Sequence, residues 1–420
     1  MSFTALNLHP NLLRAVEALG FTTPTPIQRD AIPPVREGRD VVACAMTGSG
    51  KTAAFFLPII ERLMAKPRGV TRALIIAPTR ELAAQIEADL RDLARFTPVR
   101  GAAVFGGVGM GPQEAALRRG IDVIVATPGR LLDHMQYPYA RLDGIEVLVL
   151  DEADRMLDMG FLPDIRRILG RLPRQRQTLL FSATIPAPIA ALAREFQRDP
   201  LSINQERKAA PATGITHAVY PVAQEVKSGL LQALLRRDEM RSVLVFTRTK
   251  HRCNRLAEQL TRAGIAAERI HGNRSQTQRT VALESFKRGK VRVLVATDIA
   301  ARGIDIDELS HVVNFDVPSV ADDYIHRAGR TARAGAVGEA MTFVAPAEMG
   351  DLKAIERALG KSLPRLTVEG FDYTSRPAEK LEVPLAQRIA AIRARRADDR
   401  ARARVNTARR TTNLAGQRTR

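Results

Sequence analysis

The sequence predicts an α/β fold in two tandem units, each built on a parallel sheet with helices on both faces. Short apolar runs alternate with stretches of helical periodicity, which is typical of a covered parallel sheet. The alternation stops at a polar stretch that contains Pro and Gly, and then it begins again. With 420 residues and 45% hydrophobic content, the chain has room for two or three domains with buried cores.

The first predicted unit covers residues 1–203. Its clearest helix is expected at 81–96, because apolar residues recur from Leu82 to Leu93 at helical spacing. Its expected strands are the apolar runs at 41–44, 73–77, 99–105, 122–126, 147–150 and 178–181.

A linker is expected at 204–214, and the second predicted unit covers residues 215–362. A helix is indicated at 251–263 by the same periodicity. The expected strands of this unit are the runs at 217–222, 243–246, 291–296, 312–315 and 340–344. The second unit therefore repeats the alternation of the first.

Residues 363–420 are expected to form a basic tail. Residues 385–420 contain eleven Arg and two Asp, a net charge of +9 out of +19 for the whole chain. They offer too little apolar surface to offset the entropy of ordering. The excess charge predicts a polyanionic partner, with nucleic acid as the commonest kind and an acidic membrane surface as the alternative. A solvated extension without a partner is the alternative for the tail itself.

The chain is expected to be soluble and cytoplasmic. Residues 1–10 lack a secretory signal pattern, and the apolar run at 53–60 is far shorter than the ~20 residues that span a bilayer. Cys44 and Cys253 have no metal-type spacing, so neither a disulfide nor a zinc site is expected.

A phosphate-binding turn is predicted at residues 45–52, directly after the apolar run at 41–44. Its glycines let backbone N–H groups converge on a phosphate, and the helix that follows adds its positive end. Lys51 can neutralise the outer phosphates and Thr52 can bind Mg²⁺. A glycine-rich turn without a ligand is the alternative. The predicted cradle consists of Thr47, Gly48, Ser49, Gly50, Lys51 and Thr52.

Carboxylates follow the apolar run at 147–150. Asp151 falls at the carboxyl end of a predicted strand, where open α/β sheets bind ligands, and can hold Mg²⁺ beside Thr52. Glu152 can polarise a water for attack on a γ-phosphate. This pair predicts hydrolysis of a nucleoside triphosphate, whereas a helix N-terminus with favourable acidic charges is the alternative.

The literal Asp151-Glu152-Ala153-Asp154 resembles the signature of DEAD-box RNA helicases, and further stretches between residues 1 and 345 match that family in order. The resemblance implies two RecA-like domains that bind ATP, Mg²⁺ and RNA. Met156 to Phe161 and the short N-terminus look most like the bacterial RhlE-type subgroup. In the stretch 20–28, which resembles the family's Q motif, Phe21 would stack on adenine and Gln28 would bond its edge.

The resemblance also implies contacts with the sugar–phosphate backbone of RNA, without base reading. Ser182 and Thr184 would couple hydrolysis to strand separation through Asp154. The implied RNA contacts are Pro78, Thr79, Arg80, Gly106, Gly107, Thr127, Pro128, Gly129, Arg130, Thr247, Gln276, Arg279, Thr297 and Asp298.

The stretch 324–333 resembles the family's arginine-finger motif. Arg330 and Arg333 would reach across a cleft to the transferring phosphoryl group, His326 and Arg327 would bind nearby groups, and Asp305 would bind the ribose. Ala328 and Ala332 depart from the usual wording of the motif, but the arginines remain.

The resemblance implies RNA-stimulated ATP hydrolysis with non-processive unwinding of short duplexes, driven by closure of the two domains. Two alternatives stay open: a static RNA clamp gated by ATP, and a motor directed at DNA.

Overall fold

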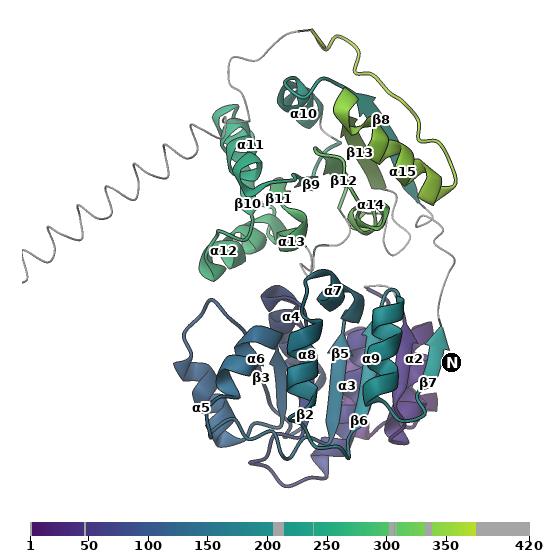
Figure 1. The fold of residues 1–420 in the computed structure, drawn as a ribbon, viewed down its shortest axis with the longest axis vertical. Coiled ribbons are helices and arrows are strands. Elements are labelled where there is room, and N and C mark those ends of the chain that lie inside the picture. The colour runs from purple at the N-terminus through teal and green to yellow at the C-terminus, as the bar shows by residue number, and fades with distance from the viewer. Residues whose placement is uncertain are drawn as a thin grey trace, which may run out of the picture.

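The computed structural model describes residues 2–45, 48–204, 214–237, 239–301, 306, 309–331 and 338–374. They form two α/β units, one above the other in Figure 1. The predicted fold class is confirmed, since each unit contains one parallel sheet. The predicted linker, 204–214, begins with the last residue of a strand and otherwise lies almost wholly outside the described residues, as do Thr47, Asp305, Arg333 and the stretch 375–420.

The first sheet has seven strands, of which six correspond to the expected apolar runs and the seventh, at 201–204, was not expected. In the five inner strands nearly every residue is buried, so burial of both faces holds the centre of the sheet together, whereas the two edge strands are mostly partly exposed. Its order across the sheet is β3 (Gly101–Val104), β4 (Val123–Ala126), β2 (Ala73–Ile76), β5 (Val147–Asp151), β6 (Gln177–Ser182), β1 (Val41–Cys44) and β7 (Leu201–Asn204).

Helices cover both faces of this sheet (Figure 1). One core packs one group of helices against one face, and a second core packs the other group against the opposite face. The first group is η1 (Phe3–Leu6), α1 (Pro10–Ala18), α2 (Pro26–Arg36), α3 (Lys51–Met64) and α4 (Arg80–Leu93). The second is α5 (Gly111–Arg119), α6 (Pro128–His134), α7 (Ala153–Asp158), α8 (Leu162–Leu169) and α9 (Ala187–Phe196).

The second sheet has six strands, in the order β10 (Ala267–Ile270), β11 (Val293–Ala296), β9 (Val243–Phe246), β12 (His311–Asn314), β13 (Gly338–Val344) and β8 (Ile215–Pro221). Counted along the chain within each unit, both sheets run third, fourth, second, fifth, sixth, first. The first sheet adds β7 beyond its first strand. The two units therefore share one topology, and the carboxyl ends of equivalent strands occupy equivalent places.

The helices of the second unit also lie on both faces. α10 (Lys227–Leu235) and α11 (Lys250–Arg262) pack on one core. The other face carries α12 (Gln276–Lys287), α13 (Asp298–Ala301), α14 (Ala321–Ala328), η2 (Pro346–Glu348) and α15 (Met349–Leu359).

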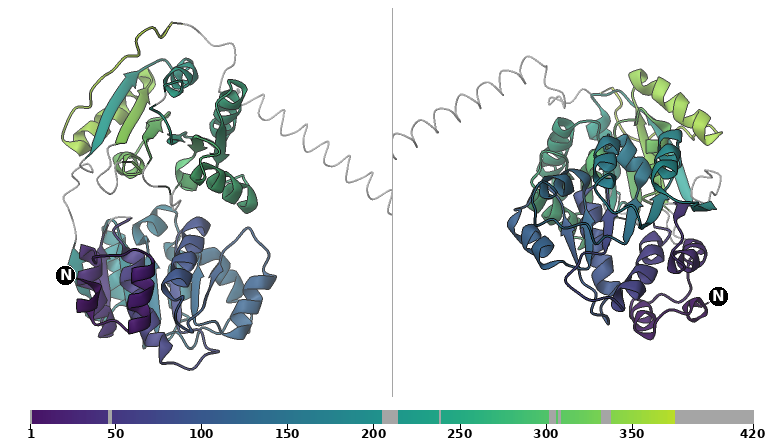
Figure 2. Two further views of the ribbon diagram at one scale, coloured as in Figure 1. Left: turned by 180° about the vertical axis from the view of Figure 1, so that it is seen from behind. Right: turned by 60° about the horizontal axis from the view of Figure 1, so that its bottom comes forward.

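The folded contacts of the second unit continue beyond residue 362, where the sequence placed the start of the tail. Residues 363–374, named here the C-terminal strap, run along the outer side of β8 (Figure 2). The backbone of Val219 in β8 accepts from Leu366 and donates to Pro364, both at 2.8 Å. Val368 and Phe371 pack against the core that α10 shares. The strap thereby pairs the edge strand of the sheet, which the sequence did not indicate because the alternation of apolar runs and helical stretches fades from about Leu363.

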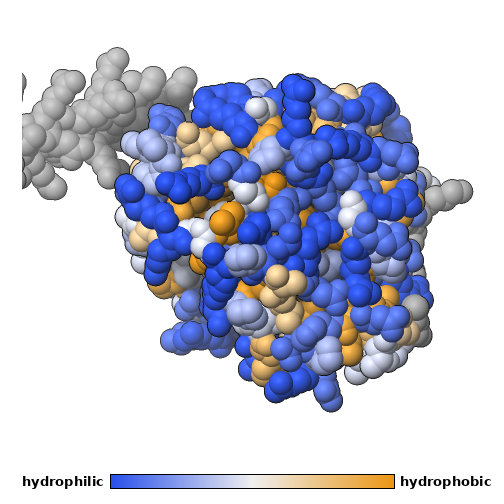
Figure 3. Space-filling view, turned by 90° about the horizontal axis from the view of Figure 1, so that it is seen from below, coloured by the Kyte–Doolittle hydropathy of each residue, from blue (hydrophilic) through white to orange (hydrophobic). Residues whose placement is uncertain are grey.

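Within the described residues, the structure contains no helix with the length and apolar character that a membrane span requires. Figure 3 shows the molecule from below, and hydrophobic areas on this face are small and scattered among hydrophilic side chains.

Candidate nucleotide and nucleic-acid site

The turn between β1 and α3 has the geometry of a phosphate cradle. Gly50 immediately precedes α3 and has a φ of 91°, in the left-handed region. A Cβ at this position would lie 2.5 Å from Nε2 of Gln28, so a side chain here would collide with its neighbour. Glycine is therefore required at residue 50 by both conformation and space.

Lys51 is the first residue of α3 and its amine is buried, with 6% of the side chain exposed. The amine is 3.9 Å from Oδ1 of Asp151, and among the described residues it has no hydrogen-bond partner. A buried ammonium without hydrogen bonds is costly. The residue lines a cavity of about 270 Å³, together with Gly48, Gly50, Thr52 and Asp151. An anionic phosphate in this cavity would satisfy the amine, so these residues fit a nucleoside triphosphate.

Asp151 ends β5 and is 3% exposed. Burial raises the pKa of its carboxyl to about 6, although the nearby Lys51 acts in the opposite direction. Its Oδ1 accepts a hydrogen bond from the backbone N–H of Glu152. A cation beside this carboxylate would favour its charged form, which fits the predicted Mg²⁺ ligand.

Glu152 has a φ of 53°, a conformation that costs a residue with a Cβ about 1 kcal/mol or more. Its carboxylate forms a buried ion pair with Arg155, one turn along α7. Burial acts to raise the pKa of Glu152, but Arg155 and Lys51 outweigh it and lower the pKa. The carboxylate is therefore charged and held at the cavity wall, where it can accept a proton from water.

Gln28 joins the predicted base site to the cradle. Its Nε2 donates to the carbonyl of Gly50 at 3.1 Å, and its Oε1 accepts from the backbone N–H of Thr25 at 2.9 Å. Phe21 is 41% exposed, packs against Phe3 with ring centroids 6.4 Å apart, and lines the same cavity as Gln28. Both residues thus line the cavity of the predicted cradle, with the Gln28 amide bonded to backbone.

Arg330 of the second unit lines the same cavity as Lys51 and Glu152 of the first. It is 8% exposed, and its charge acts on the pKa of Glu152. His326, on α14, is exposed and close enough to Asp154 and Arg155 to feel their charges. The site is therefore assembled from both units. Its other predicted members, Arg333, Asp305 and Thr47, lie outside the described residues.

Arg327 is placed inside the second unit and is not among the residues that line the cavity. Its guanidinium is bidentate to Asp298, at 2.6 and 2.7 Å, and also donates to Asn314 and to the carbonyl of Asp316. The sequence analysis predicted that Arg327 binds the nucleotide and that Asp298 binds RNA. In the structure the two side chains form an ion pair that links α13 and α14.

The coupling residues come together at the end of β6. Asp154 donates its backbone N–H to Oγ of Ser182 at 2.9 Å. Its Oδ2 accepts from the backbone N–H and the hydroxyl of Thr184, at 2.9 and 3.1 Å. These bonds tie the strand that carries Asp151 and Glu152 to the loop after its neighbour, so a shift of one moves the other.

The predicted RNA contacts of the first unit lie at the carboxyl ends of β2, β3 and β4. The guanidinium of Arg80 lies against the Gly106–Gly107 turn, and a Cβ on Gly107 would be 2.0 Å from its Nη1. Arg130 donates to the carbonyl of Val108 at 3.1 Å. Thr79 caps α4, and Pro78 precedes it. Thr127 precedes α6, which starts with Pro128 and Gly129. This edge presents backbone N–H groups, helix N-termini and arginines to a phosphate chain.

Two predicted RNA contacts of the second unit bond the first unit instead. Gln276 donates to Oε1 of Glu81 at 2.9 Å, and Arg279 pairs with its Oε2 at 3.0 Å. Thr247 is buried and donates to the carbonyl of Ala296, while Thr297 is half-buried after β11. Sequence reasoning missed the role of Glu81, although the residue belongs to the stretch 78–82 that carried the resemblance.

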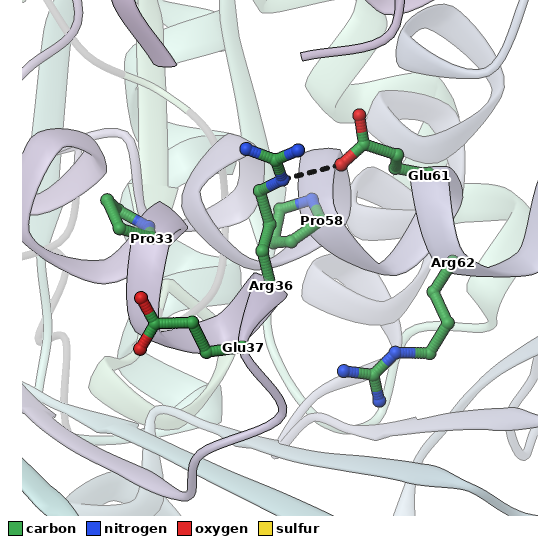
Figure 4. Close-up of a pocket in the computed structure, with 6 residues that line it drawn as sticks. All are labelled: Pro33, Arg36, Glu37, Pro58, Glu61 and Arg62. Atoms are coloured by element: carbon green, nitrogen blue, oxygen red, sulfur yellow. Dashed lines mark hydrogen bonds and ion pairs between the residues drawn. The ribbon is translucent and has the colours of Figure 1, made fainter. Parts of the chain in front are cut away.

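Several residues without a motif also line the nucleotide cavity. Gln85, Asp89 and Asp92 of α4 do so on one face of the helix, and only their helical spacing after Leu82 could have indicated it. A larger cavity of about 490 Å³ lies between α2 and α3 and contains none of the predicted site residues (Figure 4). There Arg36 pairs with Glu61 at 2.6 Å, and Arg62 donates to the carbonyl of Val35.

Comparison with known families gives two matches that together cover most of the two units. The model for the DEAD/DEAH box helicase matches residues 25–192, and the model for the helicase conserved C-terminal domain matches residues 226–335.

Known relatives match almost the whole described chain. The DEAD-box ATP-dependent RNA helicase CshA of Geobacillus kaustophilus is 42% identical over 382 residues, which cover 91% of this chain and 82% of the relative. A solved structure of S. cerevisiae Dbp5 bound to RNA and ADP BeF3 is 31% identical, with a TM-score of 0.78, and covers 87% of this chain and 95% of its own. DEAD-box helicase Mss116 bound to ssRNA and UDP-BeF has a TM-score of 0.80 at 28% identity, covering 88% of this chain and 81% of its own. The CshA name of the relatives does not support the RhlE-type subgroup.

Proposed function

The chain belongs to the DEAD-box family of ATP-dependent RNA helicases, and we propose that it couples RNA-stimulated ATP hydrolysis to local, non-processive opening of short RNA duplexes or remodelling of RNA–protein complexes. One observation carries this proposal: Arg330 of the second unit lines the same cavity as Lys51 and Glu152 of the first. Hydrolysis thus requires the closed arrangement of the two units, in which Arg330 reaches the cavity. RNA that binds both units stabilises this closed arrangement.

Three residues of the cavity are proposed to act directly in the hydrolysis. Lys51 neutralises the outer phosphates, Glu152 orients a water and accepts its proton, and Arg330 stabilises the charge that develops on the phosphoryl group. Asp151 and Thr52 would hold Mg²⁺, which would supply further positive charge toward the phosphates. Arg333 is proposed to assist Arg330, and Asp305 to bind the ribose. Gln28 links base recognition to the cradle through its bond to Gly50.

RNA is proposed to lie along the edge formed by Arg80, Gly106, Gly107 and Arg130 and to continue onto the second unit near Thr297. These groups recognise sugar and phosphate, so the bound strand is held without regard to base sequence. Solved relatives bound to RNA support RNA as the partner. Because ATP and RNA are both cytoplasmic, we propose a cytoplasmic location. Within the family, the CshA-named relatives describe the chain better than the RhlE type does.

The test is steady-state ATP hydrolysis with matched RNA and DNA oligonucleotides, measured beside unwinding of a short RNA duplex. We expect stimulation by RNA and ATP-dependent unwinding. A static clamp would release product slowly and separate few strands, and a DNA-directed motor would be stimulated by DNA. In Glu152→Gln we expect kcat to fall by about 10²-fold or more, with nucleotide binding retained. Turnover of Glu152→Gln at the wild-type rate would contradict the role of Glu152.

A further inference from the structure

An aromatic pair lies on the surface of the first unit, just after α6. Tyr137 is 50% exposed and stacks on Tyr139 with ring centroids 5.3 Å apart and planes only 6° from parallel. The guanidinium of Arg118, on α5, lies 4.7 Å from the centroid of the Tyr139 ring. Figure 1 shows α5 and α6 on one flank of this unit, below the level at which the two units meet. No part of the proposed nucleotide site uses these residues.

A buried hydrogen-bond chain fixes this pair to the proposed RNA edge. His134 is fully buried, and its Nδ1 is 3.0 Å from the hydroxyl of Tyr139. Its Nε2 is 3.4 Å from Oε1 of Gln113. Gln113 in turn donates to the carbonyls of Phe105 and Gly109, which flank the Gly106–Gly107 turn. The position of the pair is therefore fixed relative to the turn at which the RNA backbone is proposed to bind. Because the pair is already ordered, RNA binding costs little additional side-chain entropy.

Positive charge surrounds the pair. Arg118, Arg141 and Arg171 are all exposed. The guanidinium of Arg171 donates to the carbonyl of Met135 at 3.4 Å, and Arg141 follows Tyr139 closely in the chain, where its backbone N–H donates to the carbonyl of Tyr139. Two acidic side chains lie nearby, and each is paired with an arginine: Glu114 with Arg118 at 2.7 Å and Asp133 with Arg130 at 3.8 Å. A flat aromatic face among arginines is complementary to a base and its phosphates, and far less so to an apolar peptide.

We propose that Tyr137 is a stacking platform for a nucleobase of single-stranded RNA, where the strand leaves the Gly106–Gly107 turn and passes along α6. This inference rests on the proposed RNA function and extends it to a contact with bases. α6 has seven residues, so the platform lies about 10 Å from the start of that helix, a span of a few nucleotides. The contact is tolerant of sequence because every base has an aromatic face.

The chain contains no Trp, so Tyr137→Trp creates a single fluorescent reporter at the platform. We expect quenching of its emission by single-stranded RNA of about 16 nucleotides, and none by RNA of about 6 nucleotides that fills only the central edge. The same long RNA with abasic sites in its extension should quench weakly. Equal emission with all three probes would overturn the proposal.

Affinity provides the second measurement. Tyr137→Ala should weaken binding of the long RNA about five-fold or more and leave the short RNA unchanged, whereas Tyr137→Phe should bind as wild type. Arg118→Gln should weaken the long RNA in the same direction. Arg91→Gln is its matched control, because Arg91 also pairs with a glutamate one turn away on an exposed helix, and α4 covers the opposite face of the sheet.

Measurement of ATP hydrolysis distinguishes failure of the Tyr137 platform from failure of the proposed function. If short RNA stimulates hydrolysis but Tyr137→Ala binds long RNA as wild type does, the platform is refuted and the proposed function stands. If no RNA stimulates the wild-type chain, the proposed function fails first.

Discussion

The two units share one topology but use the same lysine position in opposite ways. Lys51 and Lys227 are each the first residue of the helix that follows the first strand of their sheet. Lys51 has no hydrogen-bond partner among the described residues. Lys227 is completely buried, donates to the carbonyl of Phe315 at 2.8 Å and pairs with Glu348.

The difference lies in what surrounds each amine. The loop before Lys51 contains glycines that leave room for an anion, whereas residues 222–226 before Lys227 contain none. Glu348, from η2, supplies within the protein the negative charge that a ligand must supply to Lys51. The comparison shows that a buried lysine becomes a ligand-binding group when the fold leaves its charge unmatched, and a structural group when the fold matches it.

Removing Lys227 should have the largest effect on stability. Lys227→Ala leaves Glu348 buried, and among the described residues its remaining ion-pair partner is the more distant Arg248, 3.6 Å away. We expect a loss of about 3–5 kcal/mol of unfolding free energy, measured by urea titration. Lys227→Met combined with Glu348→Leu should recover most of that loss. A Lys227→Ala protein as stable as wild type would contradict the structural role of Lys227.

Lys51→Ala should show the converse behaviour. We expect stability to be unchanged or slightly increased, because a buried and poorly satisfied charge is removed. ATP hydrolysis should fall by about 10²- to 10³-fold, since a group that faces the phosphates is lost. A stability loss similar to that of Lys227→Ala would mean that Lys51 is structural too.

The contact between the units can be tested at Glu81. A double-mutant cycle with Glu81→Gln and Arg279→Gln should give a coupling of about 1–3 kcal/mol in RNA-stimulated kcat/KM, because their charge-assisted pair exists only when the units meet. Hydrolysis without RNA and the stability of each unit should change little. Strictly additive single effects would show that the pair does not contribute to the closed arrangement.

The smallest effect concerns a histidine in the first strand of the second unit. Burial, reinforced by Lys361, lowers the pKa of His217 from its ordinary value to about 4. Below the ordinary pKa of histidine, the unfolded chain binds a proton at His217 whereas the folded chain does not. The folding stability that this group contributes above its ordinary pKa is therefore lost as the pH falls toward 4. We expect about 1 kcal/mol less stability at about pH 5.5 than at about pH 7.5 from this group. His217→Gln should reduce the slope by this amount, and the remainder should persist because burial also lowers the pKa of His271 to about 4. His251→Gln, at an exposed position, should leave the slope unchanged.

Local patterns in the sequence predicted much of the molecule. The strand 41–44 and the carboxylates after 147–150 were identifiable because their signals span only a few consecutive residues. The partner of Glu81 was not, since Gln276 lies 195 residues away and has the local sequence of a helix start. Arg327 was predicted to bind the nucleotide because it lies in a compact motif. In the structure it donates instead to Asp298, Asn314 and the carbonyl of Asp316 within its own unit. Contacts between distant side chains depend on packing that neither periodicity nor spacing encodes.

The C-terminal strap determines where the chain can be shortened without damage. A chain cut after residue 362 would lose the backbone bonds of Pro364 and Leu366 with Val219, and with them the pairing on the outer edge of β8. An unpaired strand edge recruits other chains, so such a fragment would tend to aggregate. Its loss of RNA binding could then be mistaken for a property of the arginine-rich tail. The informative truncation ends at Thr374, because it removes the charge of residues 385–420 and leaves the strap paired with the outer edge of β8.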